Sequence, residues 1–294
     1  MNKEYYIKKA EKLYNNKDYK NLFEVYKKLL EFEENSIYYF RAGFSLYMLQ
    51  DYRRAIIYFE KAFDMAIKNK THIHYYYFFY LGASYNNINK YEKSIKYLEM
   101  SLELSPYNHN IHRWIASGYY NLSNYQKALE YYSNVLSIDN NNPENFKSVG
   151  LCYYKLENYD EAIEYLEKAI ELYSKNNEKD YKSILLLGIS YYRIDKYKKA
   201  LENLLEAKYI SQNNDSVYYY IGLCHLSVKD YINAIDNFNK QLSLLEEDNI
   251  SSICYLAICY YQLKDYKKHF RLIKKARKLS KSNNNKHQLC SICI

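Results

Sequence analysis

The sequence predicts an all-α fold, and three observations support this prediction. Only 6 Gly and 2 Pro occur among 294 residues, so few turn-forming residues interrupt the chain. The alternation of apolar and polar residues that marks β-strands is missing. Apolar residues instead recur at intervals of three and four, as at Phe146, Val149 and Tyr153, which places them on one face of a helix.

A repeat of 34 residues runs through the chain. A tyrosine that follows a polar turn recurs at steps of 33, 39, 34, 34, 38, 34 and 35 residues, and self-similarity at such a period is typical of a solenoid. These tyrosines are Tyr19, Tyr52, Tyr91, Tyr125, Tyr159, Tyr197, Tyr231 and Tyr266. We expect a single array of eight units from residue 3 to residue 281, followed by a polar, cysteine-containing tail at 282–294. The units are 3–35, 36–69, 75–108, 109–142, 143–175, 181–214, 215–249 and 250–281.

Small residues occupy fixed positions when each unit is numbered from 1 to 34. Because Gly costs about 1 kcal/mol relative to Ala inside a helix, the glycines at position 8 predict a close approach of two helices there. Position 10 is also small, and Cys152, Cys224 and Cys259 at this position are predicted to be packing residues. Position 8 holds Ala10, Gly43, Gly82, Ala116, Gly150, Gly188, Gly222 and Ala257.

Each unit is predicted to contain two helices joined by a turn that ends at position 16. This position usually carries Asp or Asn, the residue types that cap the first free amides of a helix. The predicted caps of the second helices are Asp18, Asp51, Asn124, Asn158, Asp230 and Asp265.

This pattern resembles the tetratricopeptide repeat over nearly the whole chain. The end units depart most, with Lys9 and Lys12 in the first and His269 in the last. The resemblance implies a right-handed superhelical solenoid of helix–turn–helix pairs. The third unit carries the motif as Phe78, Leu81, Gly82, Tyr85, Ser94, Leu98, Ser101 and Pro106.

The resemblance also implies a peptide-binding concave surface, formed by positions 5, 9, 12 and 13 of each first helix. Position 12 is Tyr in six units, and the centre of the chain is basic at these and neighbouring positions, including Lys182. We therefore expect a protein or peptide ligand with apolar anchors around an acidic centre. The alternative is that these tyrosines are packing residues stacked between units. The predicted binding residues are Phe40, Phe44, Tyr47, Phe79, Asn86, Arg113, Tyr120, Asn121, Lys147, Tyr154, Lys155, Tyr192 and Arg193.

Other functional classes lack their motifs. The Asn pair at positions 9 and 6 with which some members of the family hold a chaperone's C-terminal carboxylate does not occur. There is no Gly-rich phosphate loop, nucleophile elbow or HExxH motif, so we expect neither an enzyme nor a cofactor. The pairs of His at 72 and 74 and at 109 and 112 have no completing ligand for a metal. Cys290 and Cys293 lack the context of a redox or zinc motif and are expected to be free thiols.

Charge is concentrated at the C-terminal end. Residues 264–294 hold ten Lys or Arg and one acid, whereas the net charge of the whole chain is +8. This basic end is predicted to be either a solvated capping helix or, as the alternative function, an RNA or ribosome contact. An anionic membrane surface is a weaker possibility because no large apolar face accompanies the charge.

Targeting signals and cysteine usage predict the compartment. The N-terminal residues contain acids and lysines where a signal peptide needs an apolar core. No run of about 20 apolar residues occurs. Six Cys without a secretory signal indicate a reducing environment, so a cytoplasmic location is expected. The oligomeric state is left open.

Overall fold

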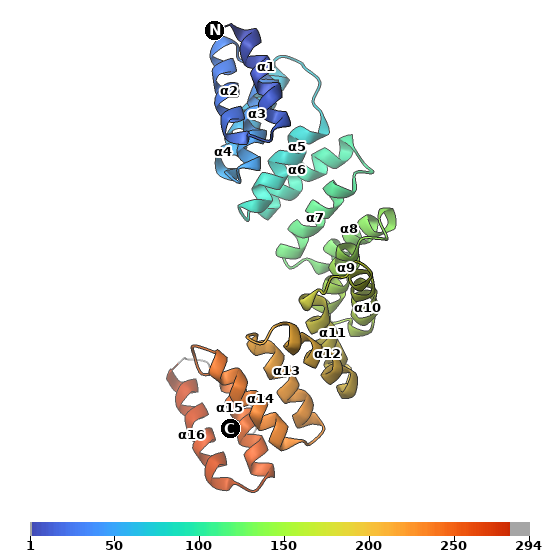
Figure 1. Ribbon diagram of the computed structural model, residues 1–294, viewed down its shortest axis with the longest axis vertical. Coiled ribbons are helices and arrows are strands. Elements are labelled where there is room, and N and C mark those ends of the chain that lie inside the picture. The colour runs from blue at the N-terminus through green and yellow to red at the C-terminus, as the bar shows by residue number, and fades with distance from the viewer. Residues whose placement is uncertain (1, 283–294) are drawn as a thin grey trace. The chain divides into compact units, whose positions relative to one another are not determined.

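The computed structural model describes residues 2–282, and helices joined by short turns and loops make up this part of the chain. Within these residues there are sixteen helices and no strand, which confirms the predicted fold class (Figure 1). The two helices of each predicted unit pack against each other as a hairpin. The helices are α1 (Lys3–Asn15), α2 (Tyr19–Phe32), α3 (Ser36–Met48), α4 (Tyr52–Lys68), α5 (Tyr75–Asn87), α6 (Tyr91–Leu104), α7 (His109–Asn121), α8 (Tyr125–Ile138), α9 (Pro143–Lys155), α10 (Tyr159–Lys175), α11 (Tyr181–Arg193), α12 (Tyr197–Ile210), α13 (Asp215–Ser227), α14 (Tyr231–Leu244), α15 (Ile250–Gln262) and α16 (Tyr266–Ser282).

The helices form two compact units, Met1–Asn140 with α1–α8 and Asn141–Ile294 with α9–α16. We call them the N-terminal and C-terminal units. Inside each unit, the second helix of a pair packs on the first helix of the next pair, as α4 does on α5 and α10 on α11. The core of the N-terminal unit includes Phe59 and Leu98, and that of the C-terminal unit includes Leu166 and Leu204. Since each pair is apolar on two sides, stacking is what buries its hydrophobic surface.

Position 8 is a point of close helix contact, as predicted. A Cβ atom added to Gly82 would lie 2.7 Å from Leu98 Cγ, and one added to Gly188 would lie 2.8 Å from Leu204 Cγ. Both leucines occupy position 24 on the second helix of the same unit and are fully buried. Glycine is therefore retained here because the facing leucine fills the space of a side chain.

The turn inside each pair passes through a left-handed residue at position 15, and none of these residues is glycine. Their φ angles lie between 56° and 63°, a region that L-residues other than Asn, Asp and Gly rarely adopt. Backbone hydrogen bonds close the turn, for example from Lys229 N to Leu226 O at 3.0 Å. These residues are Lys17, Gln50, Asn89, Ser123, Glu157, Asp195, Lys229 and Lys264.

Five of the six predicted caps at position 16 are confirmed. Asp265, for example, accepts the backbone amide of Lys268 at 3.1 Å, and this hydrogen bond holds the pKa of Asp265 below its usual range. The prediction for Asn158 is wrong, because its side chain makes no capping hydrogen bond to α10. Asp160 and Glu161 lie in the first turn of α10, where their charges favour the helix dipole without a cap. The confirmed caps are Asp18, Asp51, Asn124, Asp230 and Asp265.

Tyrosine–glutamate hydrogen bonds join consecutive pairs at their packed faces. The hydroxyl of Tyr85 on α5 donates to Glu60 Oε1 on α4 at 2.6 Å, and that of Tyr191 on α11 donates to Glu167 on α10. In both cases position 11 of one unit meets position 25 of the unit before it. Burial raises the pKa of Tyr85, and the hydrogen bond to Glu60 raises it further, so the phenol remains a donor.

The four cysteines between residues 2 and 282 are buried and form no disulfide bond, and burial raises the pKa of Cys152 to about 12. Cys152, Cys224 and Cys259 are thus packing residues, as their position 10 predicts. Cys290 and Cys293 lie outside the described residues. None of the helices between residues 2 and 282 combines the length and apolar composition that a transmembrane span requires.

Candidate functional site

The first helices of the N-terminal unit line two hollows that share a wall. The larger has a volume of about 480 Å³ and the smaller about 410 Å³, and Tyr14, Ile37 and Arg41 border both. We call the two together the aromatic groove. Three of the predicted residues, Phe40, Phe44 and Phe79, lie in its wall. The lining of the larger hollow is Tyr14, Ile37, Phe40, Arg41, Phe44, Tyr75, Tyr76, Tyr77, Phe79, Tyr80, Asn108 and Asn110.

Ring contacts hold the wall of the aromatic groove in place. Phe44 on α3 contacts Tyr14 of α1 at 6.1 Å and Tyr80 of α5 at 5.1 Å between ring centroids. Phe40 is only 7% exposed, because Tyr76 and Tyr77 pack on it at 4.8 Å. The Phe44–Tyr80 pair is edge-to-face and the other three pairs are tilted, and both arrangements are favourable for aromatic rings. These contacts fix the rings of the wall, so the groove is formed before any ligand arrives.

Arg41 is the cationic group of the aromatic groove. Its guanidinium lies 5.5 Å from the ring centroid of Tyr14, a cation–π contact. No ion pair joins Arg41 to an acidic side chain within residues 2–282, although Glu11 also borders the smaller hollow. A half-buried guanidinium without a carboxylate partner has unused donors in a fixed fork, which suits a carboxylate ligand.

Arg41 was missed in the sequence analysis because it occupies position 6. On α3 the groove wall uses positions 2, 5, 6 and 9, which follow one helix face at steps of three and four. Position 6 carries Arg41 on α3 and Tyr80 on α5. A basic residue at this position, followed by an aromatic residue at the same position of the next unit, is the sequence pattern that indicates the groove.

The remaining predicted residues of the N-terminal unit are either buried, as Asn86 is, or hydrogen-bonded to neighbouring residues, as Arg113 and Asn121 are. Asn86 is not at the surface: it is 7% exposed, it lies beside Gly118 of α7, and no hydrogen bond of its Nδ2 is present among residues 2–282. Arg113 donates to Asn110 Oδ1 at 3.2 Å, and Asn121 donates to the carbonyl of Ser117 at 2.8 Å.

Five of the six tyrosines at position 12 pack against a second tyrosine across the turn of their own unit, whereas Tyr14 contacts Phe44 of the next unit. Tyr47 contacts Tyr52 at 5.4 Å between ring centroids, and burial raises the pKa of Tyr47 to about 12. These pairs link the end of each first helix to the start of the second. The position-12 tyrosines therefore contribute to packing within their units. The other pairs are Tyr120 with Tyr125, Tyr154 with Tyr159, Tyr192 with Tyr197, and Tyr261 with Tyr266.

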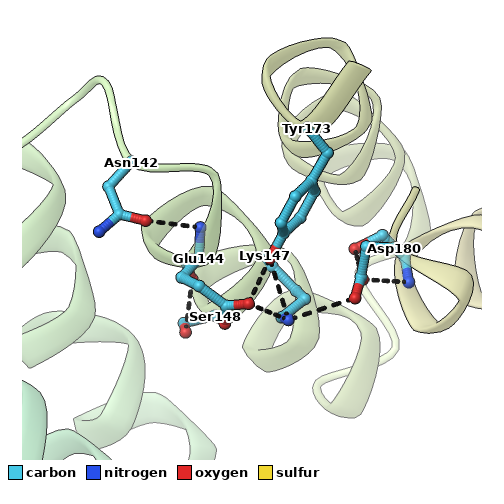
Figure 2. Close-up of polar contacts among 7 residues, drawn as sticks. Asn142, Glu144, Lys147, Ser148, Tyr173 and Asp180 are labelled. Carbon is cyan, nitrogen blue, oxygen red and sulfur yellow. Dashed lines mark hydrogen bonds and ion pairs between the residues drawn. The ribbon is translucent and has the colours of Figure 1, made fainter. Parts of the chain in front are cut away.

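Lys147 lies in an internal network of the C-terminal unit (Figure 2). Its ammonium pairs with Glu144, donates to the hydroxyl of Tyr173 at 3.1 Å and lies 3.5 Å from Asp180 Oδ1. Its side chain is 14% exposed. Burial opposes the charged form, but the hydrogen bond to Glu144 and the other partners raise the pKa of Lys147. The predicted contact between Lys147 and an acidic ligand therefore has to compete with two carboxylates of the protein itself.

Chain insertions explain this network. Helix α10 extends to Lys175, and its last turn carries Tyr173 over the start of α9. The loop that follows brings Asp180 to α11, where it accepts the amide of Ser183 at 2.8 Å and so caps the helix. The extra residues around 175–179 thus lengthen a helix and tie three helices together.

Three other predicted residues of the C-terminal unit, Tyr154, Tyr192 and Arg193, lie around Tyr220 of α13. Tyr192 contacts it at 5.8 Å between ring centroids, and Tyr154 and Arg193 also lie near it. Burial raises the pKa of Tyr154 to about 12. Arg193 and Lys155 are exposed.

No metal-binding arrangement is found in the described part of the chain: no three His, Cys, Asp or Glu side chains converge between residues 2 and 282. His72 and His74 contact each other at 4.6 Å between ring centroids, but no third ligand joins them.

Comparisons with known proteins find relatives of this architecture. The family described as "Tetratricopeptide repeat" matches residues 141–212, and "Anaphase-promoting complex, cyclosome, subunit 3" matches residues 87–169. The C-terminal part of a TPR repeat-containing protein from Cytophaga hutchinsonii is 21% identical with a TM-score of 0.64, over 85% of this chain and 98% of its own. The search of curated proteins found no match to this chain.

The names of two further solved structures state a function or a complex. PilW, a type IV pilus biogenesis factor, is 18% identical with a TM-score of 0.61, over 73% of this chain and 96% of its own. A chain of the Cut9–Hcn1 hetero-tetramer of the APC/C is 17% identical with a TM-score of 0.57, over 85% of this chain and 48% of its own. At such identities the similarity concerns the fold.

Proposed function

This chain is a tetratricopeptide repeat protein, and we propose that it is a non-enzymatic scaffold that binds a peptide segment of a partner protein in its aromatic groove. Structures of similar fold include a chain of a hetero-tetramer and a pilus biogenesis factor, which supports a role in protein–protein interaction. Buried cysteines without a disulfide bond between residues 2 and 282 fit a reducing compartment, and we extend the proposal to a cytoplasmic location.

Arg41 between aromatic walls is the observation that carries this proposal. Rigid rings such as Phe44 and Tyr80 bury apolar side chains of a ligand at a low cost in conformational entropy. An Arg without an acidic partner, set between two hollows, favours a carboxylate at the point where they meet. The peptide it fits best has an Asp or Glu flanked by apolar or aromatic residues.

The predicted acidic centre of the ligand is kept, but its place on the protein changes. Lys147 already has two carboxylate partners, so Arg41 replaces it as the residue expected to contact the acidic group. Phe44 and Phe79 remain the predicted apolar contacts, whereas Phe40 is covered by Tyr76 and Tyr77 and helps to form the wall.

A peptide array with the full chain tests the proposal. We expect wild-type protein to prefer peptides with one Asp or Glu between Phe or Leu residues. Arg41→Ala should weaken binding by about tenfold or more, because an interface Arg in an aromatic pocket is a typical hot spot. Arg41→Glu should shift the preference toward peptides with Lys or Arg at the same place, as expected for a charge pair.

Lys96→Glu is the matched control, because Lys96 is exposed on α6 of the same unit and lies outside the groove lining. It should leave both affinity and preference unchanged, and circular dichroism should show equal helicity for all variants. Binding that ignores the charge at residue 41 would overturn the assignment of the groove.

A further inference from the structure

The outer face of α16 carries an exposed aromatic side chain in a basic hollow. Phe270 is 68% exposed, although it is apolar and lies inside a helix. The hollow has a volume of about 430 Å³ and is lined by Phe270, Ile273, Lys274, Arg277, Lys278 and Lys281. We call it the terminal face. It lies far in sequence from the aromatic groove and belongs to the other unit.

Phe270 occupies position 21, which is a helix-packing position in the other units. The equivalent side chains Ile56 on α4 and Ile163 on α10 are 7% and 8% exposed. Each is covered by the first helix of the next pair, α5 or α11. The terminal face is therefore the docking face of a second helix, and no helix within residues 2–282 covers it.

The charge of the terminal face differs from that of the internal junctions. At position 25, Glu167 of α10 accepts the hydroxyl of Tyr191 from the incoming helix, whereas α16 has Lys274 there. Position 29 changes likewise, from Glu171 on α10 to Lys278 on α16. A helix that packs on this face therefore needs hydrogen-bond acceptors or carboxylates at the places where α11 has the donor hydroxyl of Tyr191.

The lysines of this face have no acidic partner in the described part of the chain. Lys274, Lys278 and Lys281 form no ion pair within residues 2–282. Two acids that contact α16 are paired with other lysines of this helix, Asp248 with Lys275 at 2.6 Å and Asp265 with Lys268 at 3.2 Å. Residues 283–294 contain a lysine and no Asp or Glu, so their charge does not complement the face.

We propose that the terminal face binds an acidic amphipathic helix of a partner protein, which packs on α16 as the first helix of a further repeat would. Its apolar stripe covers Phe270 and Ile273, and its flanking Asp or Glu residues pair with Lys274 and Lys278. A polar outer face is what the end of a soluble repeat array requires, so the exposed Phe270 is accounted for by such a partner. This surface adds a second attachment point to the proposed scaffold.

A pair of labelled synthetic helices tests this inference on the full chain. Both are amphipathic peptides of about five turns with Leu along one stripe; one has Glu on the flanks and the other has Lys. We expect the Glu peptide to bind at least about tenfold more tightly than the Lys peptide, as charge complementarity across a helix interface predicts. Phe270→Ala should weaken the Glu peptide by about three- to tenfold, since it removes the apolar contact.

Charge reversal separates this face from the rest of the molecule. Lys274→Glu with Lys278→Glu should reverse the preference toward the Lys peptide. Lys198→Glu with Lys240→Glu is the control with the same change of net charge, because both lysines are exposed in the same unit and lie outside the hollow. The control should bind the Glu peptide like wild type. The Arg41→Glu variant should do so as well, because this substitution alters only the aromatic groove.

Three results would overturn the proposal. One is equal binding of the two peptides. Another is loss of binding in the control to the same extent as in the double variant. The third is binding of an RNA oligonucleotide or of phosphatidylserine vesicles that depends on Lys274 and Lys278 but not on Phe270, with no binding of the Glu peptide, which would assign the face to phosphate ligands.

Discussion

At the scale of single residues, the side chains that define this protein are the small ones that let helices approach. Gly188 shows why: a methyl group there would meet Leu204 Cγ at 2.8 Å and the backbone nitrogen of the same residue at 3.2 Å. Because Leu204 is fully buried, it has no free space into which it could move. The glycine is thus required by its neighbour and not by its own backbone conformation, which is helical.

Gly188→Ala should lower the free energy of unfolding despite the better helix propensity of Ala. The gain in propensity is about 1 kcal/mol, whereas overpacking a core costs about 1–3 kcal/mol, so we expect a net loss of about 1 kcal/mol. Urea unfolding followed by circular dichroism measures it. In a Leu204→Ala background the loss should disappear, because the methyl group then fills a cavity. Equal losses in both backgrounds would show that the contact with Leu204 is not the cause.

Arg41 and Lys147 show that residue type alone does not decide a role in binding. Both are basic residues on first helices, but Lys147 is paired with Glu144 and Asp180, whereas Arg41 lies among rings without an acidic partner in the described residues. Only the positions of the surrounding side chains distinguish a residue that stabilises the fold from one that is available to a ligand.

At the scale of elements, the helix pair depends on a short turn that is closed without glycine. Position 15 is left-handed in all eight described turns, and lysine occupies it at Lys17, Lys229 and Lys264. The side chain that follows at position 16 usually caps the second helix. A non-Gly residue in the left-handed region costs about 1–2 kcal/mol, so this turn is stabilised by its cap and by its backbone hydrogen bonds.

Substitutions at Lys229 should rank by their tolerance of positive φ. Lys229 has a φ of 63° and an exposed side chain. Lys229→Gly should raise the free energy of unfolding by about 0.5–1 kcal/mol, because relief of the strain exceeds the added entropy of the unfolded chain. Lys229→Asn should give a smaller gain, and Lys229→Val a loss, since a β-branched residue fits this region poorly. The order Gly, Asn, Lys, Val in urea midpoints is the expected result, and a stable Val variant would contradict it.

At the scale of the whole molecule, stability is built within each of the two compact units. The buried clusters around Phe59 and Leu98 belong to the N-terminal unit, and those around Leu204 and Phe238 to the C-terminal unit. In a repeat array each pair stabilises its neighbours, and a local defect is felt most strongly nearby. Binding surfaces follow the same division, with the aromatic groove in one unit and the terminal face in the other.

A core substitution in one unit should therefore loosen that unit first. Leu204→Ala removes a fully buried side chain and should cost about 2–5 kcal/mol. Amide hydrogen exchange should then accelerate in α9–α16 and change little in α1–α8. Leu98→Ala, at the equivalent position 24 of the N-terminal unit, is the reciprocal control and should reverse the pattern. A uniform acceleration along the chain in both variants would show that the molecule unfolds as one cooperative body.

The sequence by itself determined the all-helical class, the eight units, the helix pair in each, and the glycines at the points of contact. It did so because each of these depends on a local pattern that is repeated along the chain: a spacing of three and four, a small residue opposite a large one, a cap after a turn. Asn158 is the exception, since neighbouring acids at the start of α10 made its cap dispensable.

Only the tertiary structure decided which of the outward-facing residues are available to a partner. Phe40, Asn86 and Lys147 share with Phe44 the sequence positions of a binding face, but rings, a neighbouring helix or carboxylates occupy them. Arg41 and Phe270 stand at positions that predict no special role, and their exposure depends on which helices and side chains lie opposite. Availability is a property of what surrounds a residue in space, and those neighbours come from separate units of the repeat, so a pattern read along the chain does not contain them.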